Sequence, residues 1–165
     1  MSNDQQQTTT ATVTTPGDRD IHVVREFDAP RERVYAAYTD PSLVPQWWGP
    51  RGGTTTVDVM EVRPGGAWRF VYRDADGSET AFRGTYREVT APERIVQTFE
   101  WEGMPGHVSV ETATFEDLGE RTRVVTTSIF HTPEERDGML ASGMERGMNE
   151  TYARLDELLA SQASS

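Results

Sequence analysis

Cysteine is absent from the 165-residue sequence. Without thiols the chain can form neither disulfides nor thiolate metal sites, and it has no cysteine nucleophile. The absence fits a reducing compartment, so we expect a cytoplasmic protein. The three histidines, His22, His107 and His131, form no pair with metal-ligand spacing. We therefore expect neither a metal site nor a cofactor.

Basic side chains are also few, because 16 Lys and Arg face 27 Asp and Glu, for a formal net charge of −11. An acidic surface repels phosphate backbones, so nucleic acid and anionic membranes are poor partners. No apolar run approaches the roughly 20 residues that span a bilayer, and we expect no membrane insertion. The N-terminus lacks the basic start and apolar stretch of a secretory signal.

Residues 1–19 contain almost no apolar side chain apart from Val13. Such a segment buries too little surface to offset its ordering entropy, so we predict a disordered N-terminal tail at 1–19. The remaining pattern predicts a single domain over residues 20–160 and a short polar tail at 161–165.

Seven segments have the alternation or hairpin signals of strands. They are Asp20–Phe27, Thr54–Arg63, Ala67–Arg73, Thr80–Val89, Ile95–Trp101, Val108–Glu116 and Thr122–Phe130. Two short helices, opened by Pro30 and by Asp40-Pro41, separate the first strand from the second. A long helix follows from Pro133 to about Ala160, with Thr132 as its N-cap.

No βαβ alternation is present, so the sheet is expected to be antiparallel. Trp68, Phe70 and Tyr72 share one face of their strand by period-two spacing. An antiparallel sheet with an aromatic face must cover that face, and the C-terminal helix is the element large enough to do so. The sequence therefore predicts an α+β fold.

Several short motifs resemble one known family in their order and spacing. They are Phe27-Asp28-Ala29-Pro30, Asp40-Pro41, Trp47-Trp48-Gly49-Pro50, Pro64-Gly65-Gly66, Trp68-Arg69-Phe70, Asp76-Gly77, Gly84-Thr85-Tyr86, Pro92-Glu93-Arg94 and Tyr152-Ala153-Arg154-Leu155. Over about residues 20–160 they resemble the START-like (SRPBCC) superfamily, and within it the branch of activator-of-heat-shock-protein-90-ATPase homologues.

This resemblance implies a helix-grip fold, with a curved sheet of about seven strands around the long helix and a cavity between them. Members of the superfamily bind lipids, sterols or polyketides, and some are polyketide cyclases or hydrolases. The eukaryotic co-chaperones that give the branch its name carry an extra N-terminal domain, for which this chain has no room. A chaperone partner is therefore disfavoured.

The predicted cavity is lined by aromatic and methionine side chains. These are Trp47, Trp48, Trp68, Phe70, Tyr72, Tyr86, Phe99, Trp101, Met144 and Met148, with His107 overhanging from a loop. A filled core explains the same aromatic pattern. Gly143 and Gly147 inside the helix favour a cavity, although close packing of helix on sheet explains them equally well. Trp47-Trp48 forms either a gate or a hydrophobic plug.

No catalytic constellation is evident, and the candidates for an acid or base are His107, Glu102 and Tyr86. The sequence therefore predicts binding of a small, largely apolar ligand. The alternatives are a cyclase, aromatase or hydrolase that uses the same cavity, and a chaperone-interaction module. The outer face of the sheet leaves room for a homodimer.

Overall fold

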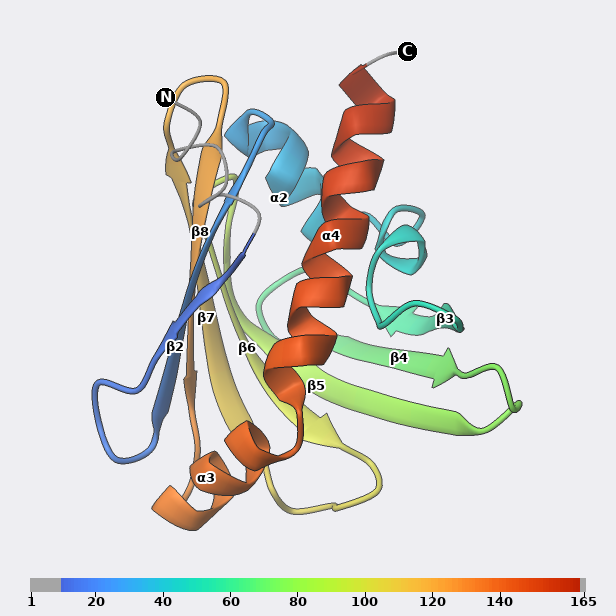
Figure 1. Ribbon diagram of the computed structural model, residues 1–165, viewed down its shortest axis with the longest axis vertical. Coiled ribbons are helices and arrows are strands. Elements are labelled where there is room, and N and C mark those ends of the chain that lie inside the picture. Colours follow the sequence, from blue (N-terminus) through green and yellow to red (C-terminus); the bar gives the residue numbers. More distant parts are fainter. Residues whose placement is uncertain (1–9, 164–165) are drawn as a thin grey trace.

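The computed structural model describes residues 10–163 and has the predicted α+β helix-grip fold (Figure 1). One curved antiparallel sheet wraps around the C-terminal helix, and two short helical pieces close one end of the groove. An antiparallel sheet of this kind can bury one face against a helix while the other faces water. A small-molecule site is therefore expected in the groove between the sheet and the C-terminal helix.

The described residues form eight strands, one more than predicted. They are β1 (Thr12–Thr14), β2 (Asp20–Phe27), β3 (Thr54–Met60), β4 (Ala67–Arg73), β5 (Glu79–Thr90), β6 (Arg94–Trp101), β7 (Ser109–Asp117) and β8 (Thr122–Ile129). Their order in the sheet is β1-β2-β8-β7-β6-β5-β4-β3. From β3 to β8, each strand is joined to the next by a hairpin. The remaining long strand, β2, pairs with β8 along its whole length.

The extra strand, β1, corrects the prediction that residues 1–19 are a disordered tail. Thr12–Thr14 pairs with β2, with Val13 opposite Val23, and Ala11 is buried. The Ala11 backbone N–H donates to Asn149 Oδ1 at 3.3 Å. Backbone hydrogen bonds to a sheet edge need no apolar side chains, so composition alone missed this strand. Residues 1–9 lie outside the described residues.

The long C-terminal helix is in fact two helices, α3 (Pro133–Ala141) and α4 (Met144–Ala163). Gly143 separates them with a φ of +83°, a conformation that favours glycine and ends a helix. The predicted N-cap is confirmed, because Thr132 Oγ1 accepts a hydrogen bond from the Glu135 N–H at 3.1 Å. Since α4 runs to Ala163, the predicted tail at 161–165 is largely helical, with residues 164–165 outside the described part.

The first short helix, α2 (Arg31–Thr39), is followed by a 3₁₀ turn, η2 (Val44–Gln46). Both lie against the sheet and α4 at one end of the groove (Figure 1).

Of the helices within residues 10–163, none combines the length and apolar character required to cross a bilayer.

The two halves of α4 meet different surroundings. Its C-terminal half packs into a filled core, where Leu155 and Leu159 are fully buried against the sheet. Phe115 of β7 lies in the same core, with its ring 5.1 Å from the Tyr35 ring of α2. The N-terminal half of α4 instead borders an open volume, which is described below.

An ion pair between a buried arginine and a partly exposed aspartate connects α4 to the sheet at the boundary between these halves. Arg25 of β2 is 2% exposed and donates to both carboxylate oxygens of Asp156, at 3.2 and 2.7 Å. Its guanidinium also lies 4.8 Å from the Phe27 ring centroid. A bidentate pair fixes direction as well as distance, so it orients α4 across the sheet.

The outer face of the sheet carries ion pairs between partly exposed side chains. Arg69 pairs with Glu102 and Asp58, and Arg83 pairs with Glu100 on the neighbouring strand. Exposed ion pairs contribute little to stability, so their main effect is to make this face of the sheet hydrophilic.

Candidate functional site

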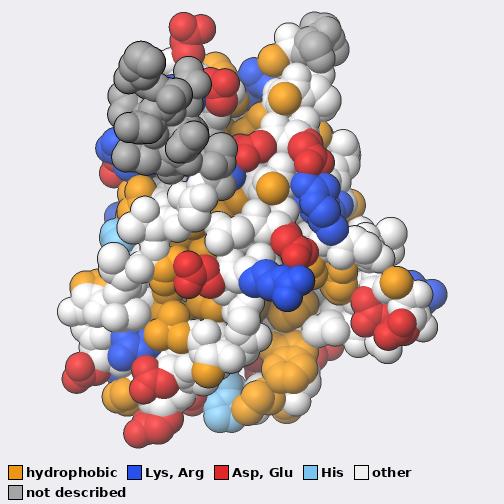
Figure 2. All heavy atoms as spheres, viewed as in Figure 1, with side chains coloured by type: hydrophobic (Ala, Val, Ile, Leu, Met, Phe, Trp, Pro, Cys, Tyr) orange, Lys and Arg blue, Asp and Glu red, His pale blue; other side chains and the backbone are white. Residues whose placement is uncertain are grey.

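A cavity of about 500 Å³ lies between the concave face of the sheet, η2 and the N-terminal half of α4, and it is partly open to solvent. Its size falls in the range of small-molecule sites, and its lining is mostly apolar. Nine of the predicted lining residues border it: Trp47, Trp48, Trp68, Phe70, Tyr72, Tyr86, Phe99, Met144 and Met148. Figure 2 shows apolar side chains at the surface beside the first turns of α4, with charged side chains on either side.

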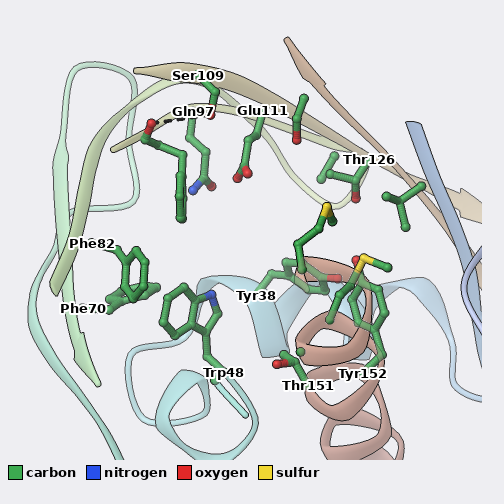
Figure 3. Close-up of a pocket in the computed structure, with 18 of the residues that line it drawn as sticks. Tyr38, Trp48, Phe70, Phe82, Gln97, Ser109, Glu111, Thr126, Thr151 and Tyr152 are labelled. Atoms are coloured by element: carbon green, nitrogen blue, oxygen red, sulfur yellow. Dashed lines mark hydrogen bonds between the residues drawn. The ribbon is translucent and has the colours of Figure 1, made fainter. Parts of the chain in front are cut away.

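One end of the cavity is an aromatic wall. The Trp48 ring lies 5.1 Å from the Phe70 ring and 5.3 Å from the Phe82 ring, both at edge-on angles. Phe82 in turn lies 5.4 Å from Phe99. Figure 3 shows Phe70, Phe82 and Trp48 grouped on one side. Edge-on packing of this kind holds each ring in place, which makes the wall a rigid apolar surface.

The two adjacent tryptophans have different roles. Trp47 is 3% exposed and donates its indole N–H to the Ala37 carbonyl at 2.9 Å, so it plugs the core behind the cavity. Trp48 faces the cavity instead (Figure 3). Its loop is fixed by Arg154 of α4, which donates to the Gly49 carbonyl at 2.8 Å. The structure therefore shows a plug for Trp47 and a wall for Trp48.

The helical side of the cavity comes from α4. Met144, Met148, Thr151 and Tyr152 lie on one face of this helix by their spacing. Between them, Gly147 has no atom within 4 Å of the position that a Cβ would occupy. Close packing of helix on sheet therefore does not explain this glycine, and its missing side chain adds to the open volume. Methionines beside it can adapt to ligands of different shape.

A polar row crosses the concave face opposite α4. Gln97 of β6 pairs in register with Glu111 of β7, which pairs with Ser128 of β8. Burial in the cavity raises the pKa of Glu111 to about 7, and a hydrogen bond with Ser128 opposes this only in part. Glu111 therefore exchanges a proton near neutrality, unlike an ordinary glutamate.

Two tyrosines face this row. Burial raises the pKa of Tyr38 well above its usual value, and the nearby Tyr152 adds to the shift. Burial also raises the pKa of Tyr152, while a hydrogen bond with Thr126 acts in the opposite direction. The Tyr38 hydroxyl is buried and lies beside the Tyr152 hydroxyl. Both phenols stay protonated at neutral pH and can donate hydrogen bonds into the cavity.

Three predicted site residues do not line the cavity. Trp101, the last residue of β6, is 43% exposed; it pairs with Phe82 of β5, but the pairing of β6 with β7 ends at Phe99. His107 lies half-exposed in the next loop, with Nδ1 2.8 Å from Glu135 Oε2 of α3. Alternation placed Trp101 in the correct strand but did not predict its exposure, and a loop residue such as His107 has no alternation by which to place it.

Glu102, the predicted acid or base, is also outside the cavity. It accepts hydrogen bonds from Arg69 at 2.7 and 3.0 Å on the outer face of the sheet. This arginine holds the pKa of Glu102 below its usual value. The carboxylate thus stays ionised in an ion pair, which is the opposite of what a general acid requires. Of the three predicted catalytic candidates, Tyr86 alone reaches the cavity, and burial raises its pKa.

The cavity also contains residues that the sequence reasoning did not select. They are mainly Tyr38, Phe82, Gln97, Ser109, Glu111, Thr126, Ser128, Thr151 and Tyr152. The signal for Glu111 was available, since it alternates with Ala113 and the fully buried Phe115 along β7. Within residues 10–163, no cluster of three or more acidic or histidine side chains is arranged to hold a metal ion.

Comparisons with known proteins agree with the architecture. The family model described as "Activator of Hsp90 ATPase homolog 1-like protein" matches residues 28–160. A crystal structure from Rhodobacter sphaeroides is 28% identical, with a TM-score of 0.87, and the match covers 92% of this chain and 99% of that one. No curated protein matches the chain.

Two further solved structures have the same fold. A solution structure from Arthrobacter aurescens is 28% identical over 91% of each chain, with a TM-score of 0.84. A crystal structure of a family member from Silicibacter pomeroyi is 23% identical, with a TM-score of 0.72, over 87% of this chain and 99% of that one.

Proposed function

The chain belongs to the family of activator of Hsp90 ATPase homolog 1-like proteins, and we propose that it binds one small, largely apolar molecule between the sheet and α4. The observation that supports this proposal is the cavity of about 500 Å³ beside Gly147. Protein interiors otherwise pack to the density of organic crystals, and voids larger than a water molecule are few.

The chemistry of the lining favours an apolar occupant. The rings of Trp48, Phe70 and Phe82 contain no polar atom apart from the Trp48 indole nitrogen. Such surface gains free energy when an apolar molecule displaces water from it, at about 25 cal/mol for each Å² buried. The few polar groups on the opposite side can orient the molecule.

Native mass spectrometry of the protein recovered from its source cells, beside a denatured sample, tests this proposal. We expect a small molecule that is retained in the native spectrum and released on denaturation. Thermal-shift measurements with a panel of apolar molecules provide an independent readout, because a ligand that binds only the folded state raises the melting temperature. A bare protein whose melting temperature no molecule raises would contradict the proposal.

An enzyme acting in the same cavity is the second candidate, and Glu111 is the observation that favours it. A carboxyl group with a pKa of about 7 inside an apolar cavity can act as general acid or base. A cyclase, aromatase or hydrolase needs such a group beside its substrate. If the second candidate is right, Glu111→Gln abolishes turnover of a polyketide-like thioester. Equal turnover by the variant and the wild-type protein would rule out this role for Glu111.

A further inference from the structure

Glu111 differs from every other side chain that borders the cavity. Among the described lining residues it is the one acidic side chain, and no Lys or Arg lines the cavity with it. Its neighbours in the sheet, Gln97 and Ser128, are neutral. A buried carboxylate in a mostly apolar cavity with no cation beside it is costly, so an ionised Glu111 lacks a complementary group.

The charged and titratable groups that pack around Glu111 do not supply that group. Tyr38 of α2 and Tyr152 of α4 are protonated phenols. Arg25 of β2 lies beyond Tyr152, where its guanidinium is bound bidentately to Asp156. Its positive charge is therefore shared with a closer carboxylate. Tyr86 of β5 lies farther along the same row and is neutral as well.

From this arrangement we propose that the ligand carries a hydrogen-bond-donating head group, a protonated amine or a hydroxyl, which pairs with Glu111 while its apolar body lies against Trp48, Phe70 and Phe82. This inference rests on the proposed binding function and names the class of ligand. Figure 3 shows Glu111 and Gln97 pointing into the cavity from the sheet, to one side of the aromatic wall. An apolar molecule that carries a carboxylate is disfavoured at the same position, because an ionised Glu111 repels it.

The polar groups beside Glu111 fit the same head group. The hydroxyls of Ser109 and Ser128, which lie on the same face of the sheet, can each accept or donate a hydrogen bond. The Gln97 amide oxygen is a further acceptor. A protonated amine has up to three donors, so it can satisfy Glu111 and these neighbours together.

Four probes that share one apolar body test this inference: 2-naphthylmethylamine, 2-naphthylmethanol, 2-naphthoate and 2-methylnaphthalene. Their dissociation constants are measured by titration calorimetry or by quenching of tryptophan fluorescence at about pH 8, where Glu111 is mostly ionised. We expect the amine to bind about tenfold more tightly than the hydrocarbon. The alcohol should lie between them, and the carboxylate should be weakest.

The wild-type protein also gives a pH test that needs no variant. Because the pKa of Glu111 is about 7, its carboxylate fraction rises between about pH 6 and about pH 8. Affinity for the amine should therefore rise with pH in this window. Affinity for the naphthoate should fall, and affinity for the hydrocarbon should stay nearly constant.

Glu111→Gln removes the charge and keeps the shape, so it should abolish the preference for the amine and improve naphthoate binding. Glu116→Gln is the matched control, since Glu116 is on the same strand but pairs with Arg123 outside the cavity. If the hydrocarbon binds and all four probes bind alike at both pH values, the inference is wrong and the proposed function stands. If no probe binds to the wild-type protein, both are contradicted.

Discussion

Gly147 allows the cavity to be filled without altering any side chain that forms its walls. The residue is inside α4, borders the cavity, and leaves open space where a Cβ would lie. A leucine at this position would extend its side chain into the volume that the ligand is proposed to occupy. An alanine would add only one methyl group there.

The two substitutions should have different effects on stability and on binding. Glycine in a helix interior costs about 1 kcal/mol relative to alanine, so Gly147→Ala should raise the free energy of unfolding by up to that amount. For a chain of this length, that corresponds to a rise of about 2–4 °C in melting temperature. Gly147→Leu should be at least as stable as the wild-type protein, because leucine also favours helices and gains buried surface.

Affinity for 2-methylnaphthalene is the property that should separate the two variants. Gly147→Ala should change the dissociation constant by less than about threefold, since most of the volume remains. Gly147→Leu should weaken binding by about tenfold or more, because its side chain and the probe cannot occupy the same space. Gly138 in α3 provides the control, since it also has open space around a Cβ but does not line the cavity. Gly138→Leu should stabilise its helix and leave affinity unchanged.

Unchanged affinity in Gly147→Leu, with the variant folded, would show that the probe does not bind in this cavity. A lower melting temperature for Gly147→Ala would contradict the reasoning in another way. It would mean that α4 requires glycine at position 147 for close packing, despite the open space around it.

The remaining predictions concern stability. Asp156→Ala should lower the free energy of unfolding by about 2 kcal/mol in chemical denaturation, because it leaves the buried Arg25 without its carboxylate; a change within error would show that the pair does not hold α4. Thr132→Ala should cost about 1 kcal/mol through loss of the α3 N-cap, whereas Thr132→Ser should cost less. The pKa of Glu111 is raised from 4.5 to about 7, so the folded state binds more protons than the unfolded state between those values. Stability should therefore fall as pH rises through this window, and Glu111→Gln should remove that part of the pH profile.

The sheet was largely predictable because its residues alternate strictly. Trp68 and Phe70 share the concave face, as period-two spacing requires, and both border the cavity. β1 was not predictable from composition, because its hydrogen bonds use the backbone and its side chains are mostly threonine. Trp101 shows the limit of the same rule: it lies in β6 as alternation predicts, yet it is exposed and follows the last residue of β6 that pairs with β7.

The helix was predictable in position but not in continuity. A helical stripe runs through both α3 and α4, yet Gly143 adopts a positive φ and divides it. Nothing in the local sequence distinguishes Gly143 from Gly147, which is the fourth residue of the regular helix α4. The difference arises from the turn that places α4 across the sheet, which is a property of the tertiary fold.

Glu111 was missed for a different reason. The sequence predicts an acid or base at Glu102 and His107, which are close together in the sequence, in or beside a loop where solvated residues are common. A charged residue within a strand is usually assigned to the outer face. Here the alternation with Ala113 and Phe115 outweighs that expectation and turns the carboxyl group inward. A charged residue on the face of a strand that alternation assigns to the interior is thus the sequence signal that marks this position.

The division of α4 explains how the protein can keep a hollow interior and remain stable. Leu155, Leu159 and the Arg25–Asp156 pair fasten the C-terminal half to a filled core. The N-terminal half carries Gly147 and Met148, which fill little space or adapt to what is present. If this half were hollow only through poor packing, larger residues at Gly147 should improve stability at no cost to binding. Greater stability with lost affinity would show instead that the open volume beside Gly147 binds the ligand at a cost in stability.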